Sequence, residues 1–333
     1  MPVTDPSTPS APSSPSAPST RTLRTALAAV AVCAATALTL ATAAPAQADE
    51  APKLREGGVP EALWNYVSSP GAVPGANDWS CKPSAEHPEP VVMLPGTFFN
   101  LGANVVKAAP RLKNAGYCVY ALNYGFTSAS LGRVGGLGPN RESAAQLDAF
   151  VDKVLASTGS TKVNILGHSL GGSVPMWWMK KMDGARKVDK YVGWAPSSHG
   201  TNLNGIVDVG SQLNLMGFVT RLSEVARFPG VIEQTNTSDY TREMWADGDT
   251  VPDGPRYTVV MTKYDTVVTP YATQALKGDD VNNVVLQDVC PTDRAGHMGL
   301  FNDDPTLQIT MNALADGPAD FKPACRGFGL QFL

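Results

Sequence analysis

The chain has 333 residues, of which 17% are charged, and its formal net charge at pH 7 is −4. This length allows one large α/β domain with a sizeable buried core. Because the chain is mildly acidic and has no run of Lys and Arg, it lacks the charge pattern of a nucleic-acid-binding protein, and we expect no nucleic-acid partner.

The first 48 residues have the composition of a disordered leader followed by a secretory signal peptide. Residues 1–20 are almost entirely Pro, Ser, Thr and Ala, which offer too little apolar surface to fold. Two arginines then precede the apolar run 25–44, and an A-x-A cleavage site ends at Ala48. We expect cleavage near Ala48, a secreted protein and no stable membrane anchor. An uncleaved anchor is the alternative, since about 20 apolar residues can span a bilayer.

Cysteine usage also indicates export. Cys33 lies within the signal peptide, and the four remaining cysteines form the even set expected for two disulfides. Four cysteines allow three pairings. We favour Cys81–Cys118 and Cys290–Cys325, because each pair flanks a predicted strand region and closes a modest loop. No metal-ligand spacing such as C-x-x-C or H-E-x-x-H occurs, so we expect neither a metal nor a cofactor.

Residues 49–333 are predicted to form a single α/β domain. A short helix over 60–67 comes first, and short apolar runs then alternate with segments of helical periodicity. This alternation predicts a mostly parallel sheet that helices cover on both faces. The predicted strands are 91–94, 118–122, 163–166, 188–195, 257–262 and 284–287, and the predicted helices include 105–115, 141–156 and 170–182.

One connection, residues 196–255, is too long for a simple crossover between two strands. It contains many apolar residues, and Ser238 is placed to cap a helix that runs through about Ala246. A long insertion in a compact domain is usually functional, so we interpret it as a cap that forms an acyl-chain pocket. The alternative is that its apolar residues simply pack on the core.

The most informative motif is G-x-S-x-G at residues 167–171. It follows the apolar strand 163–166 and precedes the helix that begins at Leu170. In that context the motif predicts a nucleophile elbow, a strained turn that lifts the Ser169 hydroxyl clear of the sheet. The flanking glycines leave room for so tight a turn. The alternative is an ordinary turn between a strand and a helix.

A serine nucleophile needs a base, and the chain has only four histidines. His87 precedes the first core strand, and the side chain of His168, beside the serine, is expected to point away. His297 follows the last predicted strand, where this topology places the base, so we predict His297. His199, in the loop after residue 195, is the alternative.

The carboxylate that orients the base is expected just after the preceding strand, 257–262. Asp265 occupies that place, and Pro270 soon after it marks a loop. The competing carboxylates lie further along the chain and are expected to be solvated surface groups. These competitors are Asp279, Asp280, Asp288 and Asp293.

Hydrolysis through a serine also needs two donors for the oxyanion. The backbone N–H of Leu170, which follows the nucleophile, is the first. The second is expected in the loop after strand 91–94, where Gly96 permits a turn and the N–H of Thr97 is our candidate. The Thr97 hydroxyl is a third possible donor. The alternative is a plain turn at the end of a strand.

Four segments together resemble the secreted class 2 lipases of actinobacterial type: Leu94–Thr97, Gly167–Gly172, Tyr264–Pro270 and Gly296–Gly299. The resemblance covers most of residues 60–315. It implies the α/β-hydrolase fold and a secreted serine ester hydrolase, with a triacylglycerol lipase or carboxylesterase as the leading interpretation.

The loop at residues 94–97 also resembles that of fungal lipase B enzymes, in which the threonine after the glycine supplies the oxyanion hole. Thr97 matches that threonine. The chain differs from many bacterial lipases in having Pro95 where a histidine usually precedes the glycine. This difference leaves the backbone donor in place but removes any role of that histidine.

The resemblance implies a lipid or other ester substrate, at a lipid–water interface in the lipase case, and we expect a monomer. A polyester hydrolase, a phospholipase or sterol esterase, and an acyltransferase are the enzymatic alternatives on the same fold. A non-catalytic binding module is the alternative from another class. Such a module is expected to lack a triad residue, whereas Ser169, Asp265 and His297 are all present.

Overall fold

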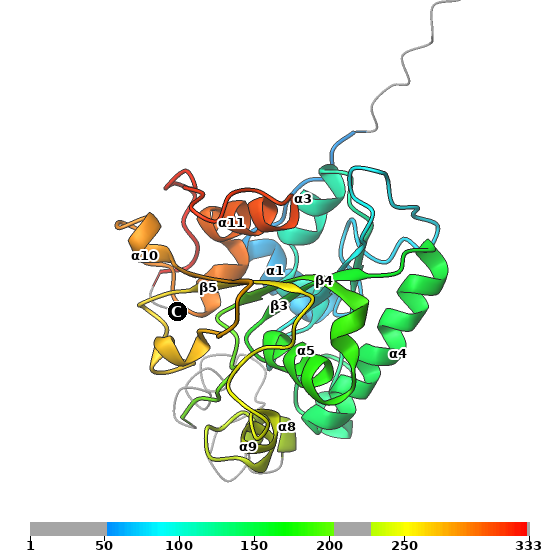
Figure 1. Ribbon diagram of the computed structural model, residues 1–333. Coiled ribbons are helices and arrows are strands. Elements are labelled where there is room, and N and C mark those ends of the chain that lie inside the picture. The colour runs from blue at the N-terminus through cyan, green and yellow to red at the C-terminus, as the bar shows by residue number, and fades with distance from the viewer. Residues whose placement is uncertain (1–51, 203–227, 332–333) are drawn as a thin grey trace, which may run out of the picture. The chain divides into compact units, whose positions relative to one another are not determined.

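A parallel sheet organises the part of the chain that the computed structural model describes, residues 52–202 and 228–331. Its six strands have the order β2-β1-β3-β4-β5-β6, and every neighbouring pair is parallel (Figure 1). The order reverses between β1 and β3, so the loops that follow these two strands diverge and open a crevice at the carboxyl edge. The strands are β1 (Val91–Leu94), β2 (Val119–Ala121), β3 (Val163–His168), β4 (Val188–Trp194), β5 (Arg256–Met261) and β6 (Val281–Val285).

Helices cover both faces of the sheet. On one face, apolar residues of α1 (Val59–Ser68), α2 (Leu101–Asn104), α3 (Ala108–Asn114) and α11 (Asp304–Leu314) join one hydrophobic cluster. On the other face, α4 (Asn140–Thr158), α5 (Leu170–Lys181) and α9 (Asp239–Met244) join a second cluster. Figure 1 shows α3 and α11 on one side of the strands and α4 and α5 on the other. The predicted α/β class, with a mostly parallel and doubly covered sheet, is confirmed.

The shorter elements connect these layers. They are η1 (Ser128–Ser130), η2 (Gly184–Lys187), α8 (Pro229–Ile232), η4 (Tyr271–Gln274), α10 (Leu286–Val289) and η5 (Met298–Asn302).

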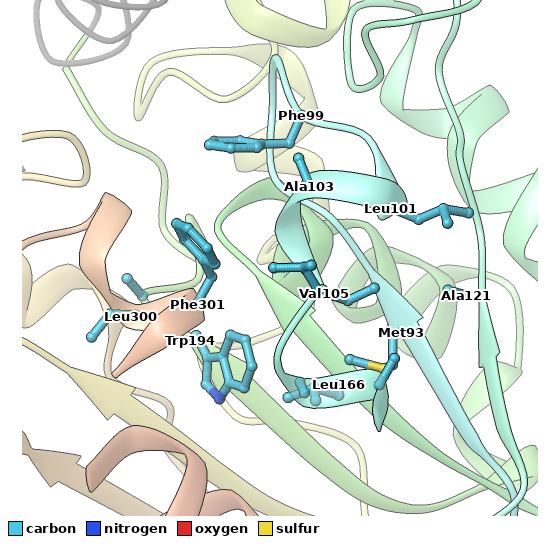
Figure 2. Packing of buried hydrophobic residues seen from close by; sticks show 14 of the residues in the cluster. Met93, Phe99, Leu101, Ala103, Val105, Ala121, Leu166, Trp194, Leu300 and Phe301 are labelled. Carbon is cyan, nitrogen blue, oxygen red and sulfur yellow. The ribbon is translucent and has the colours of Figure 1, made fainter. Parts of the chain in front are cut away.

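Alternating side chains of the strands supply the two hydrophobic clusters. Val91 and Met93 of β1 face the first cluster, and Val92 and Leu94 face the second, because successive strand residues point to opposite faces. All four are at most 1% exposed. Figure 2 shows the first cluster, which combines Met93 and Trp194 from the strands with side chains from α2 and η5. Because these strands are buried on both faces, the sequence shows continuous apolar runs here rather than an alternation of apolar and polar residues.

Two predicted elements are wrong in part. The helix predicted over 105–115 starts later, because only α3 (Ala108–Asn114) is helical there, and residues 105–107 separate it from α2 (Leu101–Asn104), a short helix that was not predicted. Pro110 has no N–H to donate to the Val106 carbonyl, and that carbonyl instead accepts from the Gly57 amide (3.1 Å). Asn100 caps α2 by accepting from the Ala103 amide, so this short helix begins before the predicted range.

The last strand also differs from its prediction over 284–287. β6 spans Val281–Val285, and the following residues form the short helix α10. Pairing with β5 decides these bounds, since Val281 is opposite Tyr257 and Val285 is opposite Met261. Two asparagines lie inside this edge strand, and a search for runs of apolar residues does not detect a strand that contains such polar residues.

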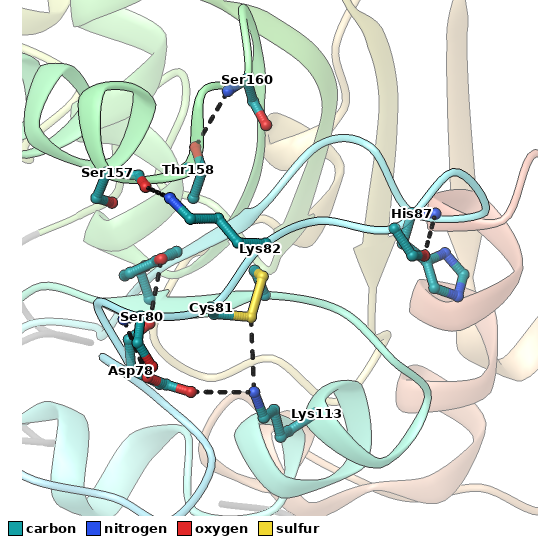
Figure 3. Close-up of a disulfide and its surroundings, with 12 residues drawn as sticks. Asp78, Ser80, Cys81, Lys82, His87, Lys113, Ser157, Thr158 and Ser160 are labelled. Carbon is teal, nitrogen blue, oxygen red and sulfur yellow. Dashed lines mark hydrogen bonds and ion pairs between the residues drawn. A yellow bond between two sulfur atoms is a disulfide. The ribbon is translucent and has the colours of Figure 1, made fainter. Parts of the chain in front are cut away.

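Both predicted disulfides are present in the structure. Cys81 is bonded to Cys118, and Cys290 is bonded to Cys325. Figure 3 shows the first bridge, beside which Lys113 Nζ lies 3.6 Å from Cys81 Sγ and 3.5 Å from Asp78 Oδ2. This bridge ties the segment before β1 to β2 and therefore anchors the N-terminal part of the described chain to the sheet.

Some predictions fall on residues outside the described ranges. The predicted leader and signal peptide, residues 1–48, are among them, as is the middle of the predicted cap, residues 203–227. The described end of that cap contains α8 and α9, and Ser238 caps α9 as expected by accepting from the Thr241 amide. Within the described ranges, no helix is long and apolar enough to cross a membrane.

Candidate active site

Ser169 occupies a sharp turn between the end of β3 and the start of α5. Its φ of 56° and ψ of −122° lie in a region that residues with a side chain rarely adopt. The Ser169 amide donates to the Trp194 carbonyl at the end of β4 (2.8 Å), which fixes the turn against the sheet. Strain of this kind persists only where the surrounding structure holds it, and it is typical of functional sites.

The two glycines of the motif make this turn possible. A Cβ on Gly167 would lie 2.0 Å from the Gly171 carbonyl oxygen, and a Cβ on Gly171 would lie 2.3 Å from the Leu94 carbonyl oxygen. Both contacts are with backbone, which cannot move aside. The sequence therefore needs glycine at both places for α5 to start so close to the ends of β1 and β3.

Asp265 and His297 are brought together from loops 32 residues apart in the chain. His297 Nδ1 lies 2.8 Å from Asp265 Oδ2, and the two residues are 2% and 7% exposed. Asp265 follows β5, and His297 directly precedes η5. Because a buried carboxylate accepts the Nδ1 proton, the imidazole has a bare Nε2 with which it can take a proton.

Every acceptor position of Asp265 is occupied. Oδ1 accepts from the amides of Val267 and Val268, each at 2.8 Å. Oδ2 accepts from Gln274 Nε2 (2.7 Å) as well as from His297. Four donors hold the buried carboxylate in one orientation.

Ser169, His297 and Thr97 line the same buried cavity. Its volume is about 10 Å³, which is room for a single water molecule. Phe98 and Val268 are among the apolar residues that line it. Thr97 follows β1, Ser169 follows β3, and His297 lies in the segment after β6. The predicted oxyanion donor, nucleophile and base therefore line one cavity.

Two backbone amides next to this cavity have no protein acceptor in the described part of the chain. These are the amides of Thr97, which lines the cavity, and of Leu170, the first residue of α5. The first amides of a helix have no intrahelical acceptor, and they lie at the positive end of the helix dipole. Neither amide is therefore committed to another protein group within the described ranges.

Two buried glutamines support these groups, and the sequence interpretation missed both. Gln274, on η4, holds Asp265, and Gln234 donates through Nε2 to the Thr97 hydroxyl oxygen (2.8 Å). Gln234 belongs to the described end of the long insertion, 137 residues from its partner. No motif marks either glutamine, since only the folded chain brings it to its partner.

The alternative base is engaged elsewhere. His199 Nδ1 donates to the Thr273 carbonyl (2.8 Å), its Nε2 lies 2.8 Å from Asp249 Oδ1, and its ring stacks on Trp245. His199 does not line the cavity that contains Ser169. The competing carboxylates Asp279, Asp280 and Asp288 are exposed, as expected, but Asp293 is fully buried.

Asp293 forms a buried pair with Asp303, the N-cap of α11. Asp303 accepts from the Thr306 amide (2.8 Å) and the Gly329 amide (2.9 Å), and Asp293 Oδ1 accepts from the Ala295 amide (2.8 Å). Among the described residues, no N–H or O–H group donates to Asp293 Oδ2, and the Asp303 side chain interacts with Asp293. A proton shared between the two carboxyl groups would satisfy this oxygen. Burial raises the pKa of Asp303 to about 6, and the neighbouring Asp293 adds to the rise.

The Asp293–Asp303 pair predicts that the free energy of unfolding depends on pH. Replacing one of the two carboxyl groups with an amide should remove this dependence. Because the pKa of Asp303 is higher in the folded chain than in the unfolded chain, its stabilising proton is present below about pH 4 and is lost as the pH rises through about 6. In Asp293→Asn, the amide donates to Asp303 at every pH. We expect the free energy of unfolding at pH 8 to rise by about 1–3 kcal/mol, measured by chemical denaturation at pH 5 and 8.

The matched control is Asp288→Asn, which changes an exposed carboxylate that pairs with Lys263. Its free energy of unfolding should follow the wild-type pH dependence. An unchanged pH dependence in Asp293→Asn would mean that the two buried carboxyl groups share no proton.

Within the described ranges, no group of three or more His, Cys, Asp or Glu side chains is arranged to hold a metal ion.

Comparison with known proteins agrees with this geometry. A family model described as lipase (class 2) matches residues 88–310, which is more than half of the chain. Aspergillus fumigatus lipase B is similar in structure, with a TM-score of 0.54 and 20% identity over 74% of this chain and 56% of that chain. The metagenome-derived lipolytic enzymes LipS and LipT provide a second similar structure, with a TM-score of 0.50 and 11% identity over 74% of this chain and 99% of that chain. At such identities the structural likeness shows the α/β-hydrolase fold.

Proposed function

We propose that the chain, which belongs to the class 2 lipase family, is an ester hydrolase and acts as a serine hydrolase through an acyl-enzyme on Ser169. The observation that supports this proposal best is the convergence of Ser169, at its strained turn, with the Asp265–His297 pair at one buried cavity. Separate loops supply the three side chains, and packing alone gives no reason to bury all three together.

In the first half of the proposed reaction, Ser169 Oγ attacks the ester carbonyl carbon while His297 Nε2 takes the hydroxyl proton. The carbonyl π-electrons move to the oxygen, which the amides of Thr97 and Leu170 stabilise. Asp265 holds the imidazolium that forms. The C–O bond to the alcohol then breaks, and His297 returns the proton to the leaving alkoxide oxygen.

In the second half, water attacks the acyl carbon of the Ser169 ester. His297 takes one proton from this water and then gives it to Ser169 Oγ as the acyl–serine bond breaks, which releases the carboxylic acid. The same two amides stabilise the second oxyanion. This cycle needs no group beyond the chain, the ester and water, and it restores the starting protonation of all three side chains.

The finer assignment is a secreted triacylglycerol lipase or carboxylesterase. We propose that residues 49–333 form one catalytic domain, that the signal peptide is cleaved near Ala48 and that the enzyme is a monomer. The two disulfides support export, since such bonds persist in oxidising compartments. We also propose that the insertion 196–255 forms the acyl-chain pocket, because its Gln234 reaches the cavity.

A chain-length profile with a covalent probe tests this proposal. The enzyme would be offered nitrophenyl esters from butyrate to palmitate, and a fluorophosphonate would label its reactive serine. Strong turnover of long chains indicates a lipase, and activity that collapses beyond butyrate indicates an esterase with a shallow cleft. A folded protein that hydrolyses no ester and leaves Ser169 unlabelled would instead be a binding module.

Thr97 offers a smaller test of the oxyanion hole. Gln234 Nε2 donates to the hydroxyl oxygen (2.8 Å), and the hydroxyl itself donates to Gln234 Oε1 over a longer distance (3.2 Å), a bond that it can exchange for a stronger one to an anion in the cavity. We expect Thr97→Val to lower kcat by about 10- to 100-fold with little change in KM, because a donor to the transition state is lost. Steady-state kinetics with nitrophenyl butyrate measures the effect.

Thr97→Ser keeps the hydroxyl and the backbone amide and is the matched control, with an expected kcat within about threefold of wild type. If the valine and serine variants have equal kcat, the hydroxyl makes no contribution, and only the backbone amide remains as a candidate donor of this residue.

A further inference from the structure

A buried hydrogen-bonded chain that the proposed mechanism does not use borders the catalytic cavity, and its central residue, His168, lines that cavity. We propose that Asn104 and His168 are positioning residues, which lock the backbone of the His297 loop to the oxyanion loop at Gly96. The inference rests on the proposed role of His297 as the base. It assigns a function to a histidine that the sequence suggested would point away from the site.

Three contacts make up this chain. His168 Nε2 lies 3.0 Å from the His297 carbonyl oxygen, and His168 Nδ1 lies 3.0 Å from Asn104 Nδ2. The Gly96 amide in turn donates to Asn104 Oδ1 (2.9 Å). The contacts span 129, 64 and 8 residues of sequence, so they join segments that no local structure would hold together.

The hydrogen-bond partners of His168 and Asn104 determine which of their atoms have a hydrogen. The His297 carbonyl can only accept, so His168 Nε2 must have the hydrogen. Asn104 Oδ1 accepts from Gly96, so Nδ2 of the amide faces His168 and donates to a bare Nδ1. His168 is therefore a neutral imidazole with one defined tautomer, whose Nδ1 accepts from Asn104 Nδ2, the nearer of the two amide atoms (3.0 Å, against 3.2 Å to Oδ1).

Burial keeps this imidazole neutral. Asn104 is fully buried and His168 is 2% exposed. Burial, together with the adjacent His297, lowers the pKa of His168 to about 3. The two rings have centroids only 5.0 Å apart, so a charged His168 would oppose the imidazolium that forms on His297 during the reaction. A neutral donor at this place positions the base without adding a like charge.

The position of this hydrogen-bonded chain explains which part of the active-site geometry it controls. Gly96 and Thr97 line the cavity on the oxyanion side, and His297 lines it on the base side. The separation of these two sides sets the geometry of the attacked carbonyl, and a misplacement of about 1 Å in an active site can cost about 100-fold in rate. Loss of the chain should therefore lower kcat more than it raises KM.

Two substitutions at residue 168 separate positioning from simple stability. His168→Gln places an amide N–H near the former Nε2 and keeps the bond to the His297 carbonyl. His168→Asn reaches only the former Nδ1 position and keeps only the bond to Asn104. Each variant loses one buried hydrogen bond, so both should lower the thermal midpoint by similar amounts.

Kinetics with nitrophenyl butyrate should nevertheless differ between them. We expect kcat of His168→Gln to stay within about fivefold of wild type and kcat of His168→Asn to fall by about 10- to 100-fold, with KM in both within about threefold. His87→Gln is the control for losing a histidine, because His87 stacks on Tyr117 outside the cavity. Equal kcat in the two His168 variants, or a loss of kcat that follows the thermal midpoint, would overturn the proposal.

Asn104 gives an independent measurement through a double-mutant cycle. If Asn104 acts through His168, Asn104→Leu should lower kcat by about tenfold, and combining it with His168→Asn should add less than about threefold. Additive losses would separate the two residues and remove Asn104 from the proposal.

If the wild-type enzyme shows no turnover and no labelling at Ser169, the proposed hydrolase function has failed. Turnover by wild type with unchanged kcat in the variants refutes only the positioning role.

Discussion

Ser169→Ala should abolish ester hydrolysis while leaving the fold intact. We expect kcat to fall by about 10⁶-fold, the loss found when the nucleophile of a comparable triad is removed. The cause is chemical, since alanine has no oxygen to attack the carbonyl. The backbone should not relax, because alanine has the same Cβ as serine at a φ of 56°. Nitrophenyl butyrate hydrolysis measures the loss, and the thermal midpoint checks the fold.

Removal of the base should act on the same step. His297→Ala is expected to lower kcat nearly as much, and the double variant should be no worse than either single variant, because a nucleophile and its base act as one unit. Fluorophosphonate labelling should be lost in Ser169→Ala. Hydrolysis retained by Ser169→Ala, in protein free of contaminating esterase, would rule out this nucleophile.

Asp265→Asn should lower kcat by about 10⁴-fold, although the change is nearly isosteric. Oδ1 of Asp265 accepts from the amides of Val267 and Val268, so an Asn NH2 group cannot occupy that side. The amide nitrogen must instead face His297 Nδ1, which then has to accept rather than donate. The imidazole is forced into the tautomer with hydrogen on Nε2, which cannot take the serine proton.

The matched control for this prediction is Asp249→Asn. Asp249 Oδ1 lies 2.8 Å from Nε2 of His199, the alternative base, whereas Asp265 Oδ2 lies 2.8 Å from Nδ1 of His297. We expect Asp249→Asn to keep kcat within about threefold of wild type, in the range of ordinary exposed substitutions. If Asp249→Asn is the variant that loses activity and Asp265→Asn is not, His199 replaces His297 as the base.

The local features of the fold were predictable because they depend on neighbouring residues. Apolar runs located β1, β3, β4 and β5, and periodicity located α4 and α5, with bounds close to those observed. The errors occurred where distant partners decide the structure. The break between α2 and α3 involves Gly57, and the bounds of β6 depend on its pairing with β5.

The candidate site divides in the same way. The sequence by itself determined the elbow at Ser169, since two glycines and a strand-to-helix transition are local, and chain order pointed to Asp265 and His297. Only the tertiary structure decided that Gln274 holds Asp265, that Gln234 holds Thr97 and that His168 contacts the His297 carbonyl. These groups are ordinary buried polar residues, and their partners are set by packing between segments far apart in the chain, which no local pattern records.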